Sequence, residues 1–243
     1  QQADLAVANN VLAHVPDIND FVAGFALLLK SHGVATFEFP HLFKLVEENQ
    51  FDTIYHEHFS YLSLTTVTRI FAANDLVVFD VEELPTHGGS LRVYAQLKNT
   101  GQQPLSDRVD KLLQREAQVG MLSKDYYTGF QARTDQIKNE FLKFLLEVRG
   151  QGKTLVAYGA AAKGNTLMNY SGIRPDLVPF VADRNPAKQG KFMPGSRIPI
   201  LAPDEIERLK PDYLLILPWN LAHEVKAQFA ILAASGTKFV TAV

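Results

Sequence analysis

The sequence predicts an α/β protein with two open sheets joined by a helical segment. Apolar runs of strand length alternate with amphipathic stretches of helical length over residues 1–100, and the alternation returns over residues 151–243. Between them, residues 101–150 are rich in Gln and charged residues, and apolar residues recur there at helical spacing. We therefore expect an α/β domain over 1–100, a helical linker over 101–150, and a doubly wound parallel sheet over 151–243.

In the first domain we expect a buried strand over residues 6–12 and a helix that opens at Pro16-Asp17 and closes with Gly33 as its C-terminal cap. The other elements predicted are a strand at 34–39, a helix at 64–73, and an antiparallel pair of strands at 77–81 and 90–97 joined by a turn at 85–89. These elements make about half of an open sheet, which leaves a central strand edge unpaired. We expect a preceding portion to complete the sheet, in preference to the second domain or another chain.

The second domain is predicted to alternate strands and helices along its length. The strands are expected at residues 155–158, 178–182, 213–217 and 238–243, and the helices from 161, at 203–209 and at 222–234. Alternation at this spacing favours a parallel sheet.

Composition narrows the class of protein. The 243 residues are 47% hydrophobic and 21% charged, with a formal net charge of −2, which is ordinary for a globular enzyme. Lys and Arg are scattered, so we expect no nucleic-acid partner. No apolar run approaches the ~20 residues that cross a bilayer, and the N-terminus does not resemble a signal peptide. Without cysteine there is no disulfide or thiolate metal site. We expect a cytoplasmic protein, with its oligomeric state open.

The stretch over residues 55–61, YHEHFSY, concentrates side chains that transfer protons. Histidine has the unperturbed pKa nearest neutral pH, and Tyr and Glu are frequent proton-transfer partners. The stretch follows a strand and helix of an α/β unit, where open sheets build their sites. It is the best candidate for an acid–base centre.

Four motifs in order resemble one known family across essentially the whole chain. They are residues 8–14 (ANNVLAH), 55–61 (YHEHFSY), 86–92 (THGGSLR) and 158–164 (YGAAAKG). The sequence resembles the nucleotide-sugar C-methyltransferases that depend on S-adenosylmethionine, which combine a class I methyltransferase domain with a Rossmann-like C-terminal domain. Family members also carry an upstream zinc-binding region and a glycine-rich cofactor loop, and neither is present in this sequence. The resemblance therefore implies part of the methyltransferase sheet plus the complete second domain.

The resemblance implies a nucleotide-diphosphate keto sugar as substrate, because a sugar C–H becomes acidic only beside a carbonyl. His58 suits the general base, and Tyr55 suits a hydrogen bond to the developing enolate oxygen. Glu57 is expected to orient a histidine or bind a sugar hydroxyl. The resemblance also gives His14 catalytic importance, just past the end of the first strand.

His56 is expected to be structural. A His-x-His pair can ligate a metal, yet a divalent ion needs three or four protein ligands and the spacing indicates no third one. We therefore expect no metal site in this sequence.

The remaining predicted contacts follow strand ends. Asn9 and Asn10 are expected beside the methyl donor. The residues expected to contact substrate are His87, Ser90, Arg92, Gly159, Lys163, Asn165 and Trp219. Small residues after the 155–158 strand suit either an anion at a helix N-terminus or tight strand-to-helix packing, and the sequence does not separate the two. Asp183 lies about where a dinucleotide fold places its ribose-binding acid.

Two other functions remain open. A nicotinamide-dependent oxidoreductase would use the second domain, although its glycine fingerprint is incomplete. A sugar-nucleotide-binding module without catalysis is the non-enzymatic alternative.

Overall fold

The computed structural model describes residues 1–242, and their contacts divide into two compact units. The first unit contains Gln1–Gln50 and His56–Phe130, and the second contains Phe51–Tyr55 and the chain from Gln131 onward. The chain thus enters the second unit for five residues in the middle of the first, which the sequence did not predict. The segment expected as a linker, residues 101–150, is divided between the two units.

The first unit is a four-stranded sheet with helices. Its strands are β1 (Ala3–Asn9), β2 (Leu29–Pro40), β3 (Leu76–Leu84) and β4 (Ser90–Leu97), in the order β1-β2-β4-β3. Strand β1 runs parallel to β2, and β4 pairs antiparallel with both β2 and β3. The helices and short 3-10 turns are α1 (Ile18–Leu28), α2 (Leu42–Glu47), α3 (Leu64–Ala73), α4 (Asp107–Gln118), η1 (Leu12–His14), η3 (Thr86–Gly88) and η4 (Lys124–Tyr127).

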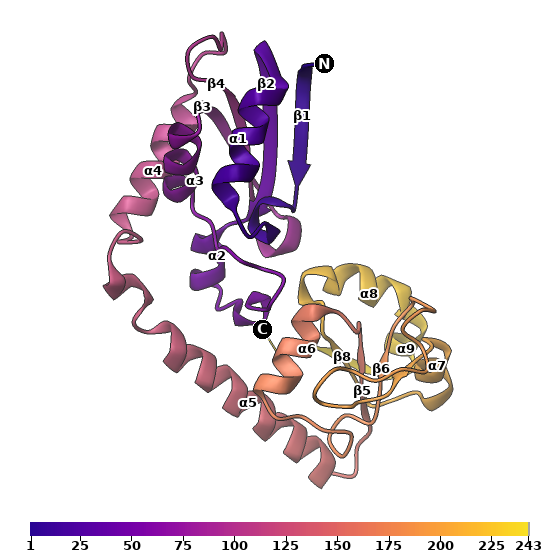
Figure 1. Ribbon diagram of the computed structural model, residues 1–243. Helices are drawn as coiled ribbons and strands as arrows, with labels where there is room; N and C mark the ends of the chain where they lie inside the picture. Colours follow the sequence, from indigo (N-terminus) through magenta and orange to yellow (C-terminus); the bar gives the residue numbers. More distant parts are fainter. Residues whose placement is uncertain (243) are drawn as a thin grey trace. The chain divides into compact units, whose positions relative to one another are not determined.

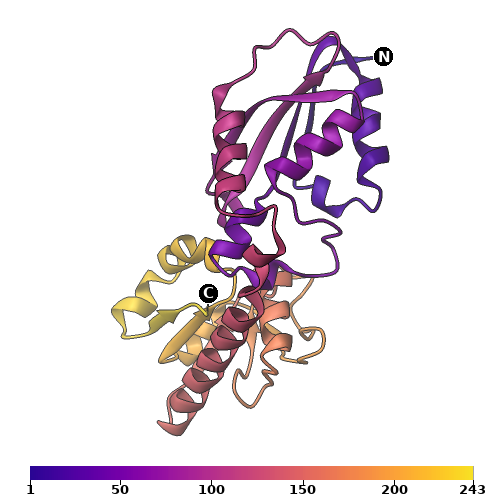
Figure 2. The same ribbon diagram turned by 90° about the vertical axis from the view of Figure 1, so that its left-hand side faces the viewer.

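One face of this sheet is apolar and carries the helices. Figure 2 shows α3 across the strands with α1 and α4 on either side of it. Phe37 of β2 packs there against Phe25 and Phe71, at ring-centroid distances of 4.6 and 4.8 Å. The opposite face carries polar side chains of β2 and β4, among them Glu38 and Arg92. Period-2 alternation in the sequence therefore separates a core face from a polar face.

Strand β1 forms the edge of the sheet that the sequence predicts to be open. Among residues 1–242 it pairs only with β2. On the face away from the helices, Leu5 and Val7 are 59% and 58% exposed. An unpaired edge with exposed apolar side chains is a surface that proteins normally cover.

The expected end of the first helix is wrong. Helix α1 ends at Leu28, and β2 begins at the next residue. Gly33 lies inside β2, where an added Cβ would come within 2.6 Å of the Ala3 carbonyl oxygen. The glycine therefore serves a close approach of β1 to β2 at a register shift, and not a helix cap. The first strand also begins earlier than expected and ends at Asn9.

The second unit is a five-stranded parallel sheet. Its strands are β5 (Leu155–Tyr158), β6 (Val181–Ala182), β7 (Ile200–Leu201), β8 (Tyr213–Ile216) and β9 (Lys238–Val240), in the order β7-β6-β5-β8-β9. The helices and turns are α5 (Phe130–Gly150), α6 (Ala162–Tyr170), α7 (Asp204–Leu209), α8 (Ala222–Gln228), α9 (Ala230–Ala234), η2 (Phe51–Thr53) and η5 (Trp219–Leu221), and Figure 1 labels most of them. Because the order reverses between β5 and β8, the sheet is doubly wound.

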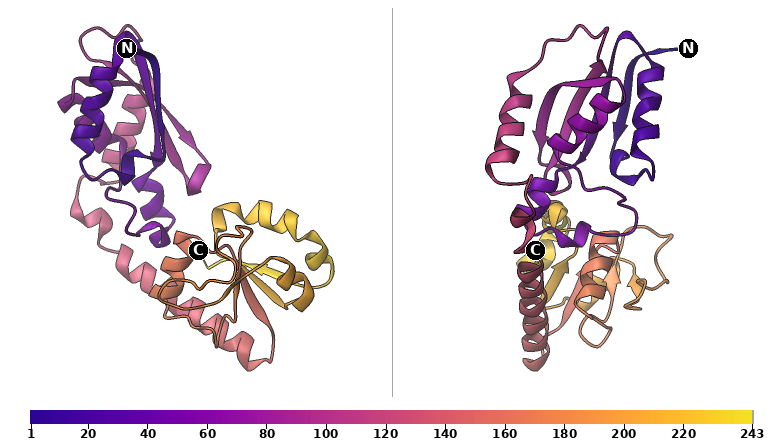
Figure 3. Two further views of the ribbon diagram at one scale, coloured as in Figure 1. Left: turned by 45° about the vertical axis from the view of Figure 1, so that its right-hand side comes forward. Right: turned by 60° about the vertical axis from the view of Figure 1, so that its left-hand side comes forward.

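The second sheet confirms the predicted fold class with changes of detail. Strand β6 is shorter than expected, β7 was not predicted, and the last predicted helix divides at Phe229 into α8 and α9. The last predicted strand ends at Val240, and Val243 lies outside the described residues. Figure 3 shows the helices of this unit around its sheet. No helix within residues 1–242 combines the length and the apolar character needed to cross a membrane.

Candidate functional site

Two histidines meet beyond the carboxyl end of β1. The backbone N–H groups of Phe59 and Ser60 both donate to the Ala13 carbonyl oxygen, at 2.8 and 3.2 Å. This pairing brings the ring of His58 to 4.8 Å from that of His14, centroid to centroid, with the planes 75° apart. The structure therefore brings together the two histidines that the resemblance singled out, at the strand edge where open sheets bind ligands.

His58 is half-buried between aromatic neighbours. The ring of Tyr61 lies edge-on to it, with centroids 6.0 Å apart. His56 and Glu57 form an exposed turn before it. Tyr55 is half-buried and belongs to the segment grouped with the second unit. Of the two histidines in the motif, His58 is thus the one that packs against other rings, whereas His56 is exposed.

Asn9 and Asn10 stand at the end of β1, as expected. Both are exposed, and Asn10 takes a left-handed backbone conformation with φ of 55°. Its N–H donates to the Glu38 carbonyl oxygen at 2.7 Å. Two short amide side chains therefore stand where the chain turns out of the sheet, a position Asn tolerates better than most residues.

A buried carboxylate that the sequence analysis missed organises the polar face. Glu38 accepts hydrogen bonds from Thr86 Oγ1 at 2.9 Å and from Arg92 Nη2 at 2.7 Å. Burial alone would raise the pKa of Glu38, but the hydrogen bonds from Arg92 and Thr86 outweigh it and lower the pKa. A lone acid between Phe37 and Phe39, facing a strand that carries Arg92, was the available signal. Arg92 is therefore already paired with the Glu38 carboxylate before any substrate binds.

The turn between β3 and β4 places the other predicted contacts of the first unit. His87 has a positive φ of 57° and is followed by two glycines with positive φ. Ser90 is buried, and its hydroxyl donates to the Thr86 carbonyl at 3.0 Å. His87 and Arg92 thus reach the same edge of the sheet as Glu38, whereas the Ser90 hydroxyl is used within the turn.

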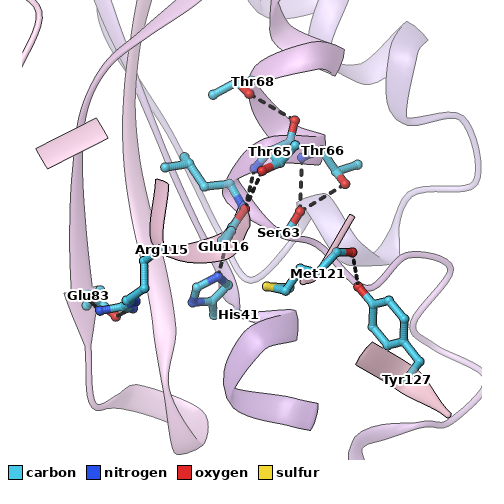
Figure 4. A network of polar contacts seen from close by, with 11 residues as sticks. His41, Ser63, Thr65, Thr66, Thr68, Glu83, Arg115, Glu116, Met121 and Tyr127 are labelled. Carbon is cyan, nitrogen blue, oxygen red and sulfur yellow. Dashed lines mark hydrogen bonds and ion pairs between the residues drawn. The ribbon is translucent and has the colours of Figure 1, made fainter. Parts of the chain in front are cut away.

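The stretch that contains His58 continues into a buried network at the start of α3, shown in Figure 4. The Glu116 carboxylate, on α4, accepts hydrogen bonds from the Leu64 N–H, the Thr65 N–H and the Thr65 hydroxyl, at 2.6 to 2.8 Å. It also accepts from His41 Nε2 at 2.7 Å. A carboxylate from another helix thus caps α3, where its negative charge suits the helix dipole.

In the second unit, the predicted contacts gather at the switch point between β5 and β8. Gly159 follows β5 with φ of 97°, and an added Cβ would collide with the Pro218 ring that follows β8. Here the glycine is required for close approach as well as for its backbone angle. This observation favours the tight-packing alternative for the 158–164 motif, although it leaves room for a ligand beyond the loop.

Replacing Gly159 by Ala is expected to destabilise the second unit by about 1–3 kcal/mol, because the new methyl group must displace Pro218. Urea unfolding followed by fluorescence measures this, since Trp219 is the single tryptophan of the chain. Gly236 is the matched control: its φ is 101° and an added Cβ meets nothing within 4 Å. Gly236→Ala should cost only backbone strain, and equal losses in the two variants would refute a role for the contact with Pro218.

Asp183 closes the loop after β5. Its Oδ2 accepts from the Ala160 N–H at 2.8 Å, and Lys188 Nζ lies 3.2 Å away. Its Oδ1 accepts from the Asn185 N–H at 2.8 Å. Both oxygens thus already accept hydrogen bonds within the protein, which argues against Asp183 as the ribose-binding acid of the nicotinamide alternative.

Lys163 and Trp219 lie together, with a partner that the sequence analysis missed. The Trp219 Nε1–H donates to Asp52 Oδ2 at 2.8 Å, and the Lys163 ammonium lies 4.2 Å from the centroid of the Trp219 ring. Lys163 also donates to Asn220 Oδ1 at 3.2 Å. Asn165, two residues after Lys163 on α6, accepts a hydrogen bond from the Asn169 side chain at 3.2 Å. No local pattern marks Asp52, because its partner is 167 residues away in the sequence.

A cavity of about 600 Å³ opens at this edge of the second sheet. Its lining includes Tyr158, Arg184 and Glu224. Arg184 makes no hydrogen bond or ion pair with any other residue in the described range, 1–242. The second unit thus offers a cavity with a basic side chain at its switch point.

Over the same range, no three His, Asp or Glu side chains are grouped so that they could hold a metal ion.

Comparison with known proteins finds methyltransferase families over both parts of the chain. Residues 85–243 match the family described as "C-methyltransferase C-terminal domain", and residues 1–81 match the family described as "Methyltransferase domain". The C-methyltransferase NovU of Streptomyces niveus is 35% identical over 241 residues, which are 99% of this chain and 57% of NovU. The chain therefore spans just over half the length of this curated relative. Among solved structures, the M1.HpyAVI–SAM complex aligns with a TM-score of 0.26 and 12% identity over 41% of this chain and 45% of that chain.

Proposed function

Because the chain belongs to the C-methyltransferase family, we propose that it forms part of an enzyme that transfers a methyl group to a carbon of a nucleotide-linked keto sugar. The observation that carries the proposal is the pairing of His14 with His58 beyond β1, at a ring distance of 4.8 Å. Carbon methylation needs a carbon nucleophile, and a base that removes a proton beside the ketone supplies one.

The chain's own residues would perform the proton transfer. His58 would accept the proton from the sugar carbon, and His14 would hold the His58 ring in place from its edge. Tyr55 would donate a hydrogen bond to the enolate oxygen as negative charge develops there. Glu57, in the exposed turn, would bind a sugar hydroxyl or orient a histidine. The enolate carbon would then be the nucleophile for a methyl group held on a sulfonium, whose C–S bond would break as the new C–C bond forms, leaving a neutral thioether.

The donor that the family implies is S-adenosylmethionine, which supplies an electrophilic methyl group when bound. The polar end of β1 fits part of such a molecule, because Asn9 and Asn10 are exposed there and Asn10 turns the backbone outward. We propose these two side chains as its contacts in this chain. We propose no zinc ligand among the residues of this sequence.

We propose the remaining residues of the motifs as substrate contacts, each within its own unit. His87, Ser90 and Arg92 would lie near the sugar or diphosphate in the first unit, and the pairing of Arg92 with Glu38 reduces its free charge. In the second unit we propose Gly159, Lys163, Asn165 and Trp219, as the motifs imply. The cavity beside them adds Arg184, an unpaired guanidinium suited to phosphate.

A test of the acid–base half requires no methyl donor. The chain is incubated in D2O with a nucleotide-linked 4-keto sugar, and the mass of the recovered sugar is measured. We expect deuterium at the carbon beside the ketone, faster than in buffer alone. No enhancement over buffer would overturn the enolate mechanism for this chain, whatever the methyl donor does.

A further inference from the structure

A polar cluster around one buried carboxylate in the second unit contains two residues proposed above as substrate contacts, Lys163 and Trp219, and links them to a segment that the proposal has not used. It consists of Asp52, Lys163, Trp219 and Asn220. Asp52 is fully buried, at 0% exposure, and one of its oxygens, Oδ1, has no hydrogen-bond partner. The other, Oδ2, accepts from the indole N–H of Trp219, whose ring carries the Lys163 ammonium. We call these four residues the Asp52 cluster.

The cluster is a poor way to stabilise a fold. Burial raises the pKa of Asp52, although Trp219 and Lys163 oppose the rise, and burial also lowers the pKa of Lys163. Both pKa shifts mean that burial makes the charged forms of Asp52 and Lys163 less favourable than they are in water. Buried charges with incomplete hydrogen bonding stabilise less than apolar residues of similar volume. A different benefit is needed to explain them, and fixing one particular arrangement of the chain is the best-known benefit of buried polar groups.

What the cluster fixes is the segment Phe51–Tyr55. Asp52 lies in η2, which packs against α6. The Phe51 ring lies 5.3 Å from that of Tyr170, at the end of α6, and the Ile54 N–H donates to the Phe51 carbonyl at 3.0 Å. Phe51, Asp52 and Thr53 are all buried. Tyr55 lies three residues after Asp52 and belongs to the same five-residue segment of the second unit.

We infer that Asp52 and Trp219, with Lys163 above the indole ring, are positioning residues that hold Tyr55 for proton transfer. The inference rests on the proposed function, because Tyr55 is the group that acts on substrate.

The test uses Trp219→Phe, which keeps an aromatic ring beneath Lys163 but removes the N–H donor to Asp52. Asp212→Asn is the matched control in the same unit, since Asp212 accepts from the Thr154 N–H at 2.8 Å and lies away from the cluster. Two readouts are measured on each protein. One is amide hydrogen exchange of residues 52–55, and the other is kcat and KM for deuterium incorporation into the 4-keto sugar nucleotide.

We expect Trp219→Phe to speed amide exchange in residues 52–55 and to lower kcat by about 10–100-fold, a larger effect than on KM, because small displacements of a catalytic group cost this much. Asp212→Asn should leave both readouts near wild type. Restored kcat in Asp52→Asn relative to Asp52→Ala would show that the acceptor oxygen, rather than the charge, is what Trp219 requires.

The outcomes separate this inference from the function it rests on. If the wild type exchanges deuterium and Trp219→Phe has the same kcat, the positioning role is refuted and the function stands. If the wild type shows no exchange, the proposed function fails, and unchanged amide exchange in the variant would refute the anchor as well. A rise in KM without loss of kcat would refute the positioning role and leave Trp219 only the substrate contact proposed above.

Lys163→Met distinguishes the two roles of the lysine. A phosphate contact predicts weaker binding of a nucleoside diphosphate by calorimetry, with unchanged amide exchange at residues 52–55. The positioning role predicts the reverse, so weaker binding alone would remove Lys163 from the Asp52 cluster.

Discussion

Replacing His58 by Asn should lower deuterium incorporation beside the ketone by about 10²–10⁴-fold, the usual contribution of a general base. Asn keeps a polar side chain of similar reach but cannot accept the proton. Methyl transfer to the sugar should fall by at least as much, because no enolate forms. Mass spectrometry of the sugar measures the first quantity and formation of the methylated sugar measures the second.

His56→Asn is the matched control for this prediction. It makes the same chemical change two residues away, in the exposed turn. Its rate should stay within about twofold of wild type, since surface substitutions rarely have large effects. Wild-type exchange in His58→Asn would rule His58 out as the base, and a large loss in His56→Asn would move the role to the other histidine.

Glu116→Ala should destabilise the first unit by about 3–5 kcal/mol, because it leaves several buried donors without their acceptor, each at a cost of about 1–3 kcal/mol. The Glu116 side chain is 1% exposed, and its loss leaves His41 and the start of α3 without their acceptor. Urea unfolding followed by far-UV circular dichroism measures the change. Asp110→Ala, an exposed acid on the same helix, should cost less than about 0.5 kcal/mol. Equal losses would mean that the helix, rather than the network, is responsible.

The same network predicts a pH dependence with a defined sign. Burial would raise the pKa of Glu116, but hydrogen bonds from His41, Thr65 and Leu64 outweigh it and lower the pKa below the model-compound value of 4.5. A depressed folded pKa means that the unfolded chain binds the proton first. The stabilisation is therefore complete above pH 4.5 and is lost as the pH falls through the folded pKa. Glu116→Gln should flatten this acid limb, and an unchanged limb would contradict the assignment.

Elements with signals at both ends were predictable from the sequence. Helix α3 occupies the predicted residues 64–73, because Ser63 caps its start and Asn74-Asp75 ends it. Gly33 was misread since a glycine that permits close approach of two strands looks the same, in sequence, as one that ends a helix. Glu116 left a signal that was not used: it falls on the apolar stripe of α4, four residues after Leu112.

The candidate site was predictable only where a motif carried it. His14 and His58 come from two motifs of one family, and the structure places them together. The Asp52–Trp219 contact joins residues with no shared pattern, and its chemistry becomes visible only when the distant partner is known. Local propensity contains no information about such a pair, so tertiary structure was required.

The excursion of Phe51–Tyr55 into the second unit has a consequence for how the protein is made. On the ribosome, this segment must wait for Trp219, which is synthesised 167 residues later. Contacts of such long sequence separation slow folding, because a long loop must close before they form. Expressing the piece from residue 131 onward alone would leave the Trp219 indole N–H without its Asp52 acceptor. A cut before residue 131 therefore does not separate the two units, because residues 51–55 of the second unit stay with the first piece.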